Sequence, residues 1–189
     1  DFITHSTETI VNQVEVLRGM VNAFGKFAEE PTLKIESFNI ISVIKESIGL
    51  YSKKDNKKIF RLNLHSESCT VQADEQKLRQ VFNNLIKNAL DATVKSSSPA
   101  INIKTNKMEI NNRPCIELTI SDNGKGFEPN IVGNAFEPYV TTKTKGKGLG
   151  LAIVKHIIEE HMGHIELQNR DKQGASVVIT LPLFQPKKG

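Results

Sequence analysis

Apolar residues at the start of the chain have the spacing of one long amphipathic helix, over residues 1–30. The apolar positions have the spacing of heptad repeats and form one stripe along the helix. They are Ile3, Ile10, Val14, Leu17, Val21 and Phe24, widened by Val16, Met20, Ala23 and Phe27. A face this broad is too apolar to stay in water, so we expect the helix to pack in a bundle or dimer. The alternative is a helix that lies on its own globular domain. Pro31 ends it, because proline disfavours helical geometry in the preceding residue.

From about residue 34 the pattern becomes mixed α/β. Strands are predicted near 35–38, 60–64, 69–73, 101–110, 115–121, 165–169 and 176–181, and helices over about 39–52, 75–95 and 149–162. Asp74 is the predicted N-cap of the second of these helices, and residues 111–114 the link of a hairpin. This order predicts a two-layer α/β sandwich, a sheet with helices on one face. We divide the chain into residues 1–31, 32–185 and a tail, 186–189.

Composition excludes several classes of protein. With 38% hydrophobic and 24% charged residues the chain is typical of a soluble globular domain, and no apolar run suits a membrane span or signal peptide. The net charge of +4 is spread along the chain without a basic stripe, so nucleic-acid binding is not indicated. Cys69 and Cys115 have no metal-ligand spacing and are interpreted as reduced thiols of a cytosolic protein.

Three segments carry candidate chemistry. On the helix after Asp74, a polar stripe of Asn84, Asn88 and Asp91 flanks the core face; amide oxygens suit Mg²⁺, although a solvated face without a role is equally compatible. Asp122 follows an apolar strand and precedes Gly124 and Gly126, where a carboxylate can accept a hydrogen bond from the amino group of a flat ligand. Many ordinary turns have the same DxGxG pattern.

The third segment, residues 145–151, places glycines at the start of an apolar helix. Backbone N–H groups there and the helix N-terminus favour phosphate. The segment has neither the GxxxxGK[ST] nor the GxGxxG pattern, because Leu151 stands where the latter has its last glycine. Lys143, Lys145 and Lys147 can screen phosphate charge, though such a run is also typical of a solvated loop.

Taken in order, these segments resemble the motifs of the histidine-kinase ATPase family, whose fold is shared with gyrase, Hsp90 and MutL. Residues 84–89 resemble its N box, 122–126 the G1 box, and 146–151 the G2 box. Phe136-Glu137-Pro138-Tyr139 with Thr141-Thr142-Lys143 resembles the F box, and Gly174-Ala175 the last glycine motif. The match covers about residues 36–183. It implies a mixed-sheet ATP-binding domain of a two-component sensor kinase.

The resemblance also implies roles for individual residues. Asn88 would coordinate Mg²⁺, with Asn84 beside it, and both residues would be catalytic. Asp122 would accept a hydrogen bond from the amino group of adenine, and Gly126 would make room for the base. Residues 128–147 would form a mobile lid. The implied ATP-binding set is Asn84, Asn88, Asp91, Ala92, Asp122, Gly124, Gly126, Phe127, Tyr139, Thr142, Lys143, Lys145, Gly146, Lys147, Gly148, Leu149, Gly150, Leu151, Gly174 and Thr180. Two departures from the pattern are Ala175, where Thr or Ser is common, and Met162, where Gly is frequent.

The family's phosphoacceptor is a histidine followed by Asp or Glu on the first helix of a dimerising hairpin. None of the five histidines here is followed by Asp or Glu. We therefore expect residues 1–31 to be only the second helix of the hairpin. We also expect that the chain does not phosphorylate itself. His156, His161 and His164 are interpreted as surface or packing residues. Residues 13–31 further resemble NtrY-type nitrogen-regulation kinases.

The implied partners are a response-regulator receiver domain and a second copy of the full-length protein, joined through the hairpin. The resemblance implies a cytoplasmic domain that meets a membrane only through segments upstream of this chain. Two other functions stay open: an ATPase or serine kinase of the anti-sigma-factor type with the same fold, and a non-catalytic ATP-dependent interaction module.

Overall fold

The structure, a computed structural model, describes residues 7, 14, 32–52, 58–65, 69–141 and 148–184. It divides the chain into two compact units, residues 1–33 and 34–189. In the first unit Thr7 and Val14 are helical, while the rest of the predicted helix lies outside the described residues. Its length and its boundary at residue 31 therefore stay predictions. Among the described residues no helix is long and apolar enough to cross a membrane.

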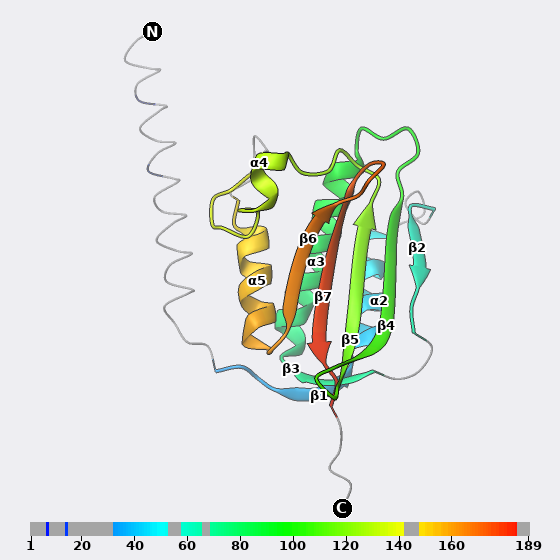
Figure 1. Cartoon of the computed structure of the whole chain (residues 1–189), viewed down its shortest axis with the longest axis vertical. Coiled ribbons are helices and arrows are strands. Elements are labelled where there is room, and N and C mark those ends of the chain that lie inside the picture. The colour runs from blue at the N-terminus through cyan, green and yellow to red at the C-terminus, as the bar shows by residue number, and fades with distance from the viewer. Residues whose placement is uncertain are drawn as a thin grey trace, which may run out of the picture. The chain divides into compact units, whose positions relative to one another are not determined.

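A five-stranded mixed sheet forms one layer of the second unit (Figure 1). Its strand order is β2–β4–β5–β7–β6; β2 runs parallel to β4, and the other neighbours are antiparallel. The strands are β2 Phe60–Asn63, β4 Ile101–Ile110, β5 Arg113–Asp122, β6 His164–Asn169 and β7 Ala175–Pro182. A separate antiparallel pair joins β1 Glu36–Asn39 to β3 Thr70–Ala73.

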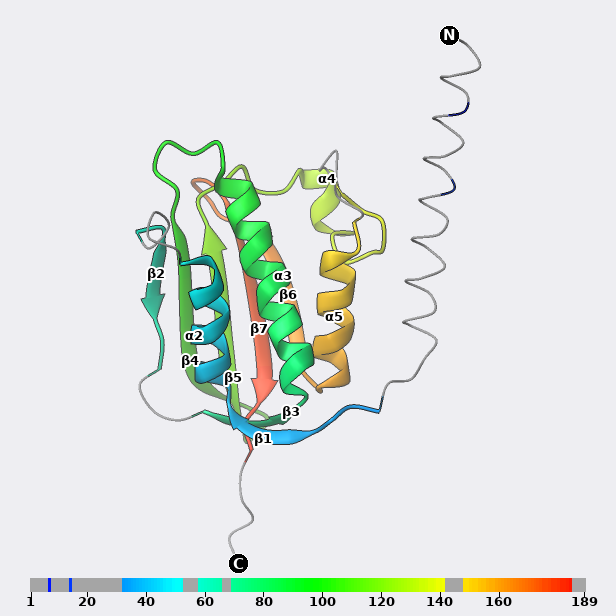
Figure 2. The same cartoon turned by 180° about the vertical axis from the view of Figure 1, so that it is seen from behind.

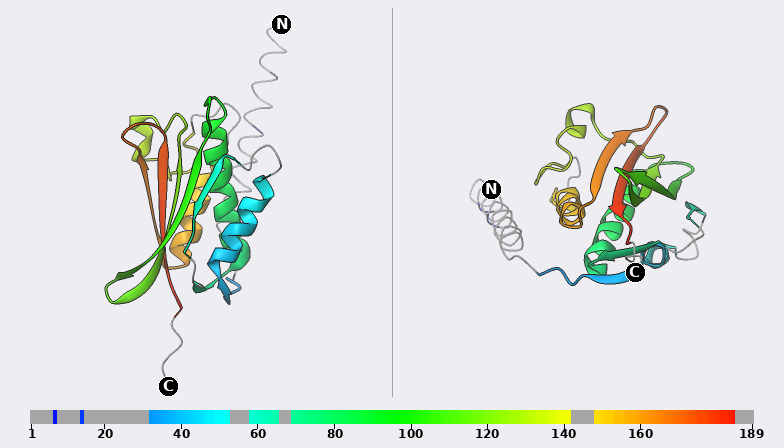
Figure 3. Two further views of the ribbon diagram at one scale, coloured as in Figure 1. Left: turned by 90° about the vertical axis from the view of Figure 1, so that its right-hand side faces the viewer. Right: turned by 60° about the horizontal axis from the view of Figure 1, so that its bottom comes forward.

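Helices α2 Ile40–Tyr51, α3 Glu75–Thr93 and α5 Gly150–Glu160 cover one face of this sheet (Figure 2). The left view of Figure 3 shows the sheet on one side and the helices on the other. The predicted two-layer α/β sandwich is therefore confirmed. These helices and all seven strands fall within a few residues of their predicted positions.

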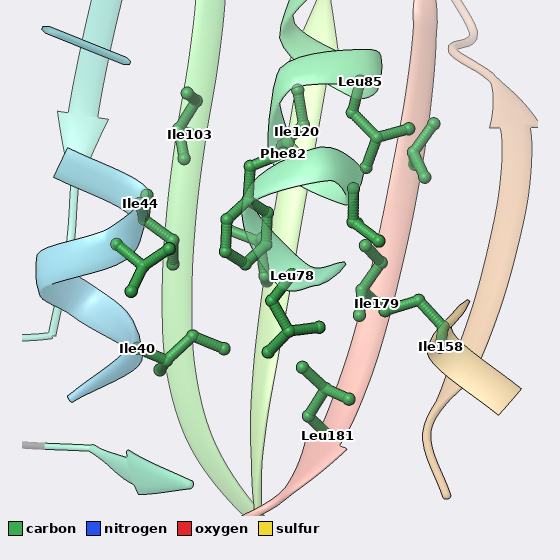
Figure 4. Close-up of a cluster of buried hydrophobic side chains, with 14 of the residues drawn as sticks. Ile40, Ile44, Leu78, Phe82, Leu85, Ile103, Ile120, Ile158, Ile179 and Leu181 are labelled. Atoms are coloured by element: carbon green, nitrogen blue, oxygen red, sulfur yellow. The ribbon is translucent and has the colours of Figure 1, made fainter. Parts of the chain in front are cut away.

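The core lies between the layers, and α3 supplies its centre. The i, i+4, i+7 spacing of Leu78, Phe82 and Leu85 puts these side chains on one face of the helix, and all three are buried. Figure 4 shows them between Ile44 of α2 on one side and Ile158 of α5 on the other. Because the buried face of α3 is apolar along its whole length, the polar stripe of this helix lies beside that face and not within the core.

Asp74 caps α3 as predicted and also ties the helix to its surroundings. Its carboxylate accepts hydrogen bonds from the backbone N–H groups of Lys77, at 3.0 Å, and Lys34, at 3.1 Å. Its own N–H donates to Nε2 of His161, at 2.9 Å, and Nδ1 of that ring lies 2.7 Å from the carbonyl oxygen of Ile157. His161 is thus a buried packing residue, as expected.

Two local features differ from the sequence prediction. The β4–β5 hairpin turns through two residues, Asn111 and Asn112, whose φ angles of 51° and 59° suit a tight turn between twisted strands. β5 therefore begins at Arg113 and includes Pro114, which had been assigned to the link. The short helix α4, Pro129–Val132, lies within the predicted lid, residues 128–147, where no helix is predicted. Four residues are too few for an apolar period to reveal a helix.

Helix α5 ends in a Schellman motif. The N–H of Gly163 donates to the carbonyl of Ile158, and that of Met162 to Glu159, both at 2.9 Å. Met162 occupies the left-handed position of the motif, with φ of 56°, and its side chain is 83% exposed. This explains why the family pattern has glycine here. A side chain at this position strains the backbone, and the exposed Met162 side chain buries little apolar surface in return.

We expect Met162→Gly to raise the free energy of unfolding by about 1 kcal/mol, because glycine removes the left-handed strain. Urea unfolding at pH 7 measures the change. Met162→Ala is the matched control, since it removes the exposed side chain but keeps Cβ and should leave stability close to wild type. Equal stabilisation by alanine would show that the strain is not the cause.

Candidate functional site

Most of the predicted site residues gather at one end of the sheet. The end of β5, the β6–β7 turn and the C-terminal half of α3 lie there, and α5 begins nearby, next to α4 (Figures 1 and 2). Residues 123–128, here called the glycine loop, connect β5 to α4 at this end. The fold therefore brings together segments that are separated by up to about ninety residues in the sequence.

Asp122 is the last residue of β5 and is only 7% exposed. Burial raises the pKa of this carboxyl above its usual range. Backbone N–H groups of Gly124 and Ala175 and the positive charge of Arg170 act in the opposite direction. The N–H of Gly124 donates to Oδ1 of Asp122 at 2.8 Å. A buried carboxylate fixed by main-chain donors is a rigid acceptor for a ligand that brings its own N–H.

Two glycines exclude side chains around Asp122 because other backbones pass close by. Gly174 has φ of 92°, and a Cβ there would lie 2.0 Å from the carbonyl oxygen of Asp122. A Cβ on Gly124 would lie 2.4 Å from the carbonyl oxygen of Ala92, near the end of α3. The position of Ala92 in the predicted binding set thus has a structural reason, since its backbone packs directly against the glycine loop.

The second half of the glycine loop is held by Asn169, the last residue of β6. The N–H of Phe127 donates to Oδ1 of Asn169 at 2.8 Å, and Nδ2 of Asn169 donates back to the carbonyl of Phe127 at 2.7 Å. Gly126 has φ of 73°, and a Cβ there would lie 2.9 Å from that Oδ1. Its positive φ favours glycine at this position, independently of any bound base.

Sequence reasoning did not select Asn169 or its neighbour Arg170. Nη1 of Arg170 donates to the carbonyl oxygen of Asp122 at 3.0 Å, and the N–H of Arg170 donates to the carbonyl of Gly174. A polar residue at the exposed end of a strand has no distinctive period. Only the pairing of β6 with β7, which brings that end beside the glycine loop, indicates its role.

The polar stripe on α3 lies at the same end of the sheet. Asn84 and Asn88 are half-buried, one helical turn apart, and Asp91 is exposed. The described residues contain no cluster of three or more His, Cys, Asp or Glu that could hold a metal ion. Amide oxygens on one helix face fit Mg²⁺, which keeps most of its waters and takes few protein ligands.

The start of α5 has backbone geometry that can accommodate an anion. Its N-cap residue, Leu149, makes no side-chain capping hydrogen bond, and no atom from outside the helix crowds the place where a Cβ on Gly150 would lie. The first N–H groups of a helix have no partner within it, so an anion can bind them. Leu151 follows in the first turn and is half-buried.

The last part of the predicted lid, residues 140–147, connects Tyr139 to Gly148. The N–H of Tyr139 donates to the carbonyl of Gly148 at 3.0 Å, and a Cβ on Gly148 would lie 2.5 Å from the carbonyl carbon of Tyr139. Both residues have positive φ, and the Tyr139 side chain is 42% exposed. Five residues of the predicted binding set lie in this segment and outside the described residues; they are Thr142, Lys143, Lys145, Gly146 and Lys147.

One predicted residue lies away from this cluster. Thr180 pairs with Glu117 and His164, four residues along β7 from Ser176. Four strand residues span about 13 Å, so the structure does not bring Thr180 to Asp122. The residue of β7 that pairs beside this end of β5 is Ser176, opposite Ser121.

Residues 73–185 match the family described as histidine kinase-, DNA gyrase B- and HSP90-like ATPases. The chain belongs to this family. A putative NtrY-like sensor histidine kinase of Rickettsia bellii is 34% identical over 94% of this chain and 28% of its own length. The nitrogen regulation protein NtrY of Azorhizobium caulinodans is 33% identical over 96% of the chain and 24% of its own length. The chain thus spans about a quarter of these relatives.

Solved structures agree with the family and with the fold. The catalytic domain of the histidine kinase ThkA superposes with a TM-score of 0.68 at 30% identity, over 79% of this chain and 95% of that one. ThkA in complex with the response regulator TrrA gives a TM-score of 0.70 at 27% identity, over 95% of this chain and 51% of that one. Residues 34–184 therefore form an ATPase domain of the histidine-kinase type.

The buried carboxylate makes a prediction about stability. Because the folded pKa of Asp122 is raised, its contribution to stability is present below its unfolded pKa and is lost as pH rises through the folded value. At pH 7 Asp122→Asn should therefore leave the free energy of unfolding unchanged or raise it, and its advantage over wild type should shrink towards pH 3.

Urea unfolding at pH 3, 5 and 7 checks this dependence. Asp171→Asn, which changes an exposed carboxylate in the β6–β7 turn, is the control and should show no comparable gain at pH 7. A clear loss of stability in Asp122→Asn at pH 7 would mean that the ionised carboxylate holds the fold together.

Proposed function

We propose that this domain binds Mg-ATP and transfers the γ-phosphoryl group to a histidine on another segment of a two-component sensor kinase. The observation that carries the proposal is the meeting of three features at one end of the sheet. These are the buried carboxylate of Asp122, the amide face of Asn84 and Asn88, and the uncapped N-terminus of α5. Each suits a different part of a magnesium-bound nucleotide.

In this proposal Asp122 accepts a hydrogen bond from the amino group of adenine. The first N–H groups of α5, from Gly150 onward, bind phosphate oxygens, and Asn88 and Asn84 bind or orient the metal. The bound Mg²⁺ supplies neutralisation of phosphate charge. Phosphoryl transfer asks the protein mainly to position the reactants and stabilise charge, and the residues of this site can do both without a nucleophile.

The lid implied by the resemblance, residues 128–147, includes Tyr139 and ends just before Gly148. Their backbone hydrogen bond fixes both ends of the intervening segment. The segment contains Lys143, Lys145 and Lys147, whose charges would screen the phosphates. The exposed ring of Tyr139 lies at the base of this segment, where it can meet the nucleotide.

The phosphoacceptor is proposed to lie on a segment other than residues 1–189. None of the five histidines is followed by Asp or Glu, and both ring nitrogens of His161 are occupied in the core. By the same reasoning the phosphate would pass to an Asp of a receiver domain, as the solved ThkA complex with a response regulator suggests. Dimerisation through a helical hairpin, a cytoplasmic position and an upstream membrane anchor belong to this proposal.

The related chemistries receive less support. A serine kinase or simple ATPase would use the same nucleotide site, but relatives that match the chain over more than nine-tenths of its length include proteins named as sensor histidine kinases. A non-catalytic module would not need Asn84, Asn88, Asp122 and the glycines together. The nature of the phosphorylated product separates these alternatives.

The experiment combines this protein, Mg-[γ-³²P]ATP and a separate helical hairpin that carries the family's phosphoacceptor histidine followed by Asp or Glu. We expect phosphate on the hairpin that is labile in acid and stable in base. Asn88→Ala should lower the rate by at least about a hundredfold, since loss of a metal ligand removes transition-state stabilisation. Gln80→Ala, an exposed change on the same helix, should keep the wild-type rate. Acid-stable phosphate on serine would refute the histidine-kinase proposal.

A further inference from the structure

The glycine loop has no regular secondary structure, and side-chain hydrogen bonds tie it to neighbouring segments. Its first half is held by Asn123. Oδ1 of this residue accepts the N–H of Ala100 at 2.8 Å, and its Nδ2 donates to the carbonyl of Ser98 at 2.8 Å. These contacts tie the start of the loop to the segment that precedes β4.

The second half is held by the two hydrogen bonds between Asn169 and Phe127. A carboxamide carries a donor and an acceptor side by side, as a peptide group does, so Asn169 pairs with the N–H and the C=O of one residue at once. Serine, aspartate or alanine cannot make both bonds. The Asn169 side chain thus makes the pair of hydrogen bonds that the backbone of a neighbouring strand would otherwise make with Phe127.

We infer that Asn169 is a positioning residue for the adenine site, which holds Gly126 and Phe127 at a fixed distance from the carboxylate of Asp122. The inference rests on the proposed function, because it assigns a role in binding the adenine of ATP. Gly126 has a left-handed backbone, and the place where its Cβ would lie is 2.9 Å from Oδ1 of Asn169 and 3.2 Å from the carbonyl oxygen of Gly174.

The effect of this contact is on binding more than on folding. The glycine loop lies at the surface, where local opening costs far less than global unfolding, so the loop can loosen while the core stays intact. A loosened loop must be ordered again when the nucleotide binds, and that cost lowers affinity. The loss should be largest for the part of the nucleotide that meets the loop, which is the base.

The test measures binding of Mg-ATP and Mg-ITP by calorimetry. The base of ITP has an oxygen where adenine has the amino group that donates a hydrogen bond to Asp122. Wild type should therefore prefer ATP, and Asn169→Ala should bind ATP about tenfold more weakly, the effect of one or two lost net hydrogen bonds. The affinity of Asn169→Ala for ITP should change much less, so the ratio of its ATP affinity to its ITP affinity should be smaller than in wild type. Gln168→Ala, an exposed change on the same strand, should match wild type.

Amide hydrogen exchange of the nucleotide-free protein is the second measurement. The Phe127 amide should be protected in wild type and exchange about tenfold faster in Asn169→Ala. If that variant fails to fold, Asn169→Asp, which keeps the shape and one acceptor, should narrow the preference for ATP in the same direction.

Wild-type exchange and wild-type affinities in the variants would overturn the inference. An equal loss for ATP and ITP would also overturn it, because a general structural defect weakens both. Failure of the wild-type protein to bind either nucleotide would instead refute the proposed function, and the exchange of Phe127 would still show whether Asn169 holds the loop.

Discussion

The close approach of the Gly174 and Asp122 backbones is the contact on which the site depends. A side chain at Gly174 would collide with the carbonyl of Asp122, so the β6–β7 turn can close over the end of β5 only with glycine there. The same turn brings Asn169 to the glycine loop and Arg170 to the Asp122 carbonyl. One backbone contact between strands far apart in sequence therefore fixes both the carboxylate and the loop beside it.

This arrangement places an ionisable group where folding alone would not favour one. Burial raises the pKa of Asp122, so its charge at neutral pH is maintained at a cost, which main-chain donors offset in part. Perturbed groups of this kind concentrate at binding sites, where a fixed acceptor in a dry environment selects a ligand. The surrounding core of α3, α5 and the sheet supplies the stability that permits it.

Much of the architecture could be predicted because it rests on periodic burial and local capping. The apolar face of α3 and the Asp74 cap are examples, and the ordered glycine motifs indicated the family. Contacts that depend on strand pairing could not be predicted. The resemblance implied Thr180, yet the register of β7 pairs this residue with Glu117, five residues before Asp122. Asn169 was missed because its role exists only once β6 lies next to the glycine loop.

The central claim is that one end of the sheet binds the whole nucleotide, base at Asp122 and phosphates at the start of α5. A titration of the ¹⁵N-labelled protein with a magnesium complex of a non-hydrolysable ATP analogue tests it most directly. The account predicts that amide shifts change at Asp122–Phe127 and Gly148–Leu151 and in the side chain of Asn88. Changes confined to the surface groove of about 370 Å³ beside Ile59, Leu90 and Val94, or no changes at all, would contradict it.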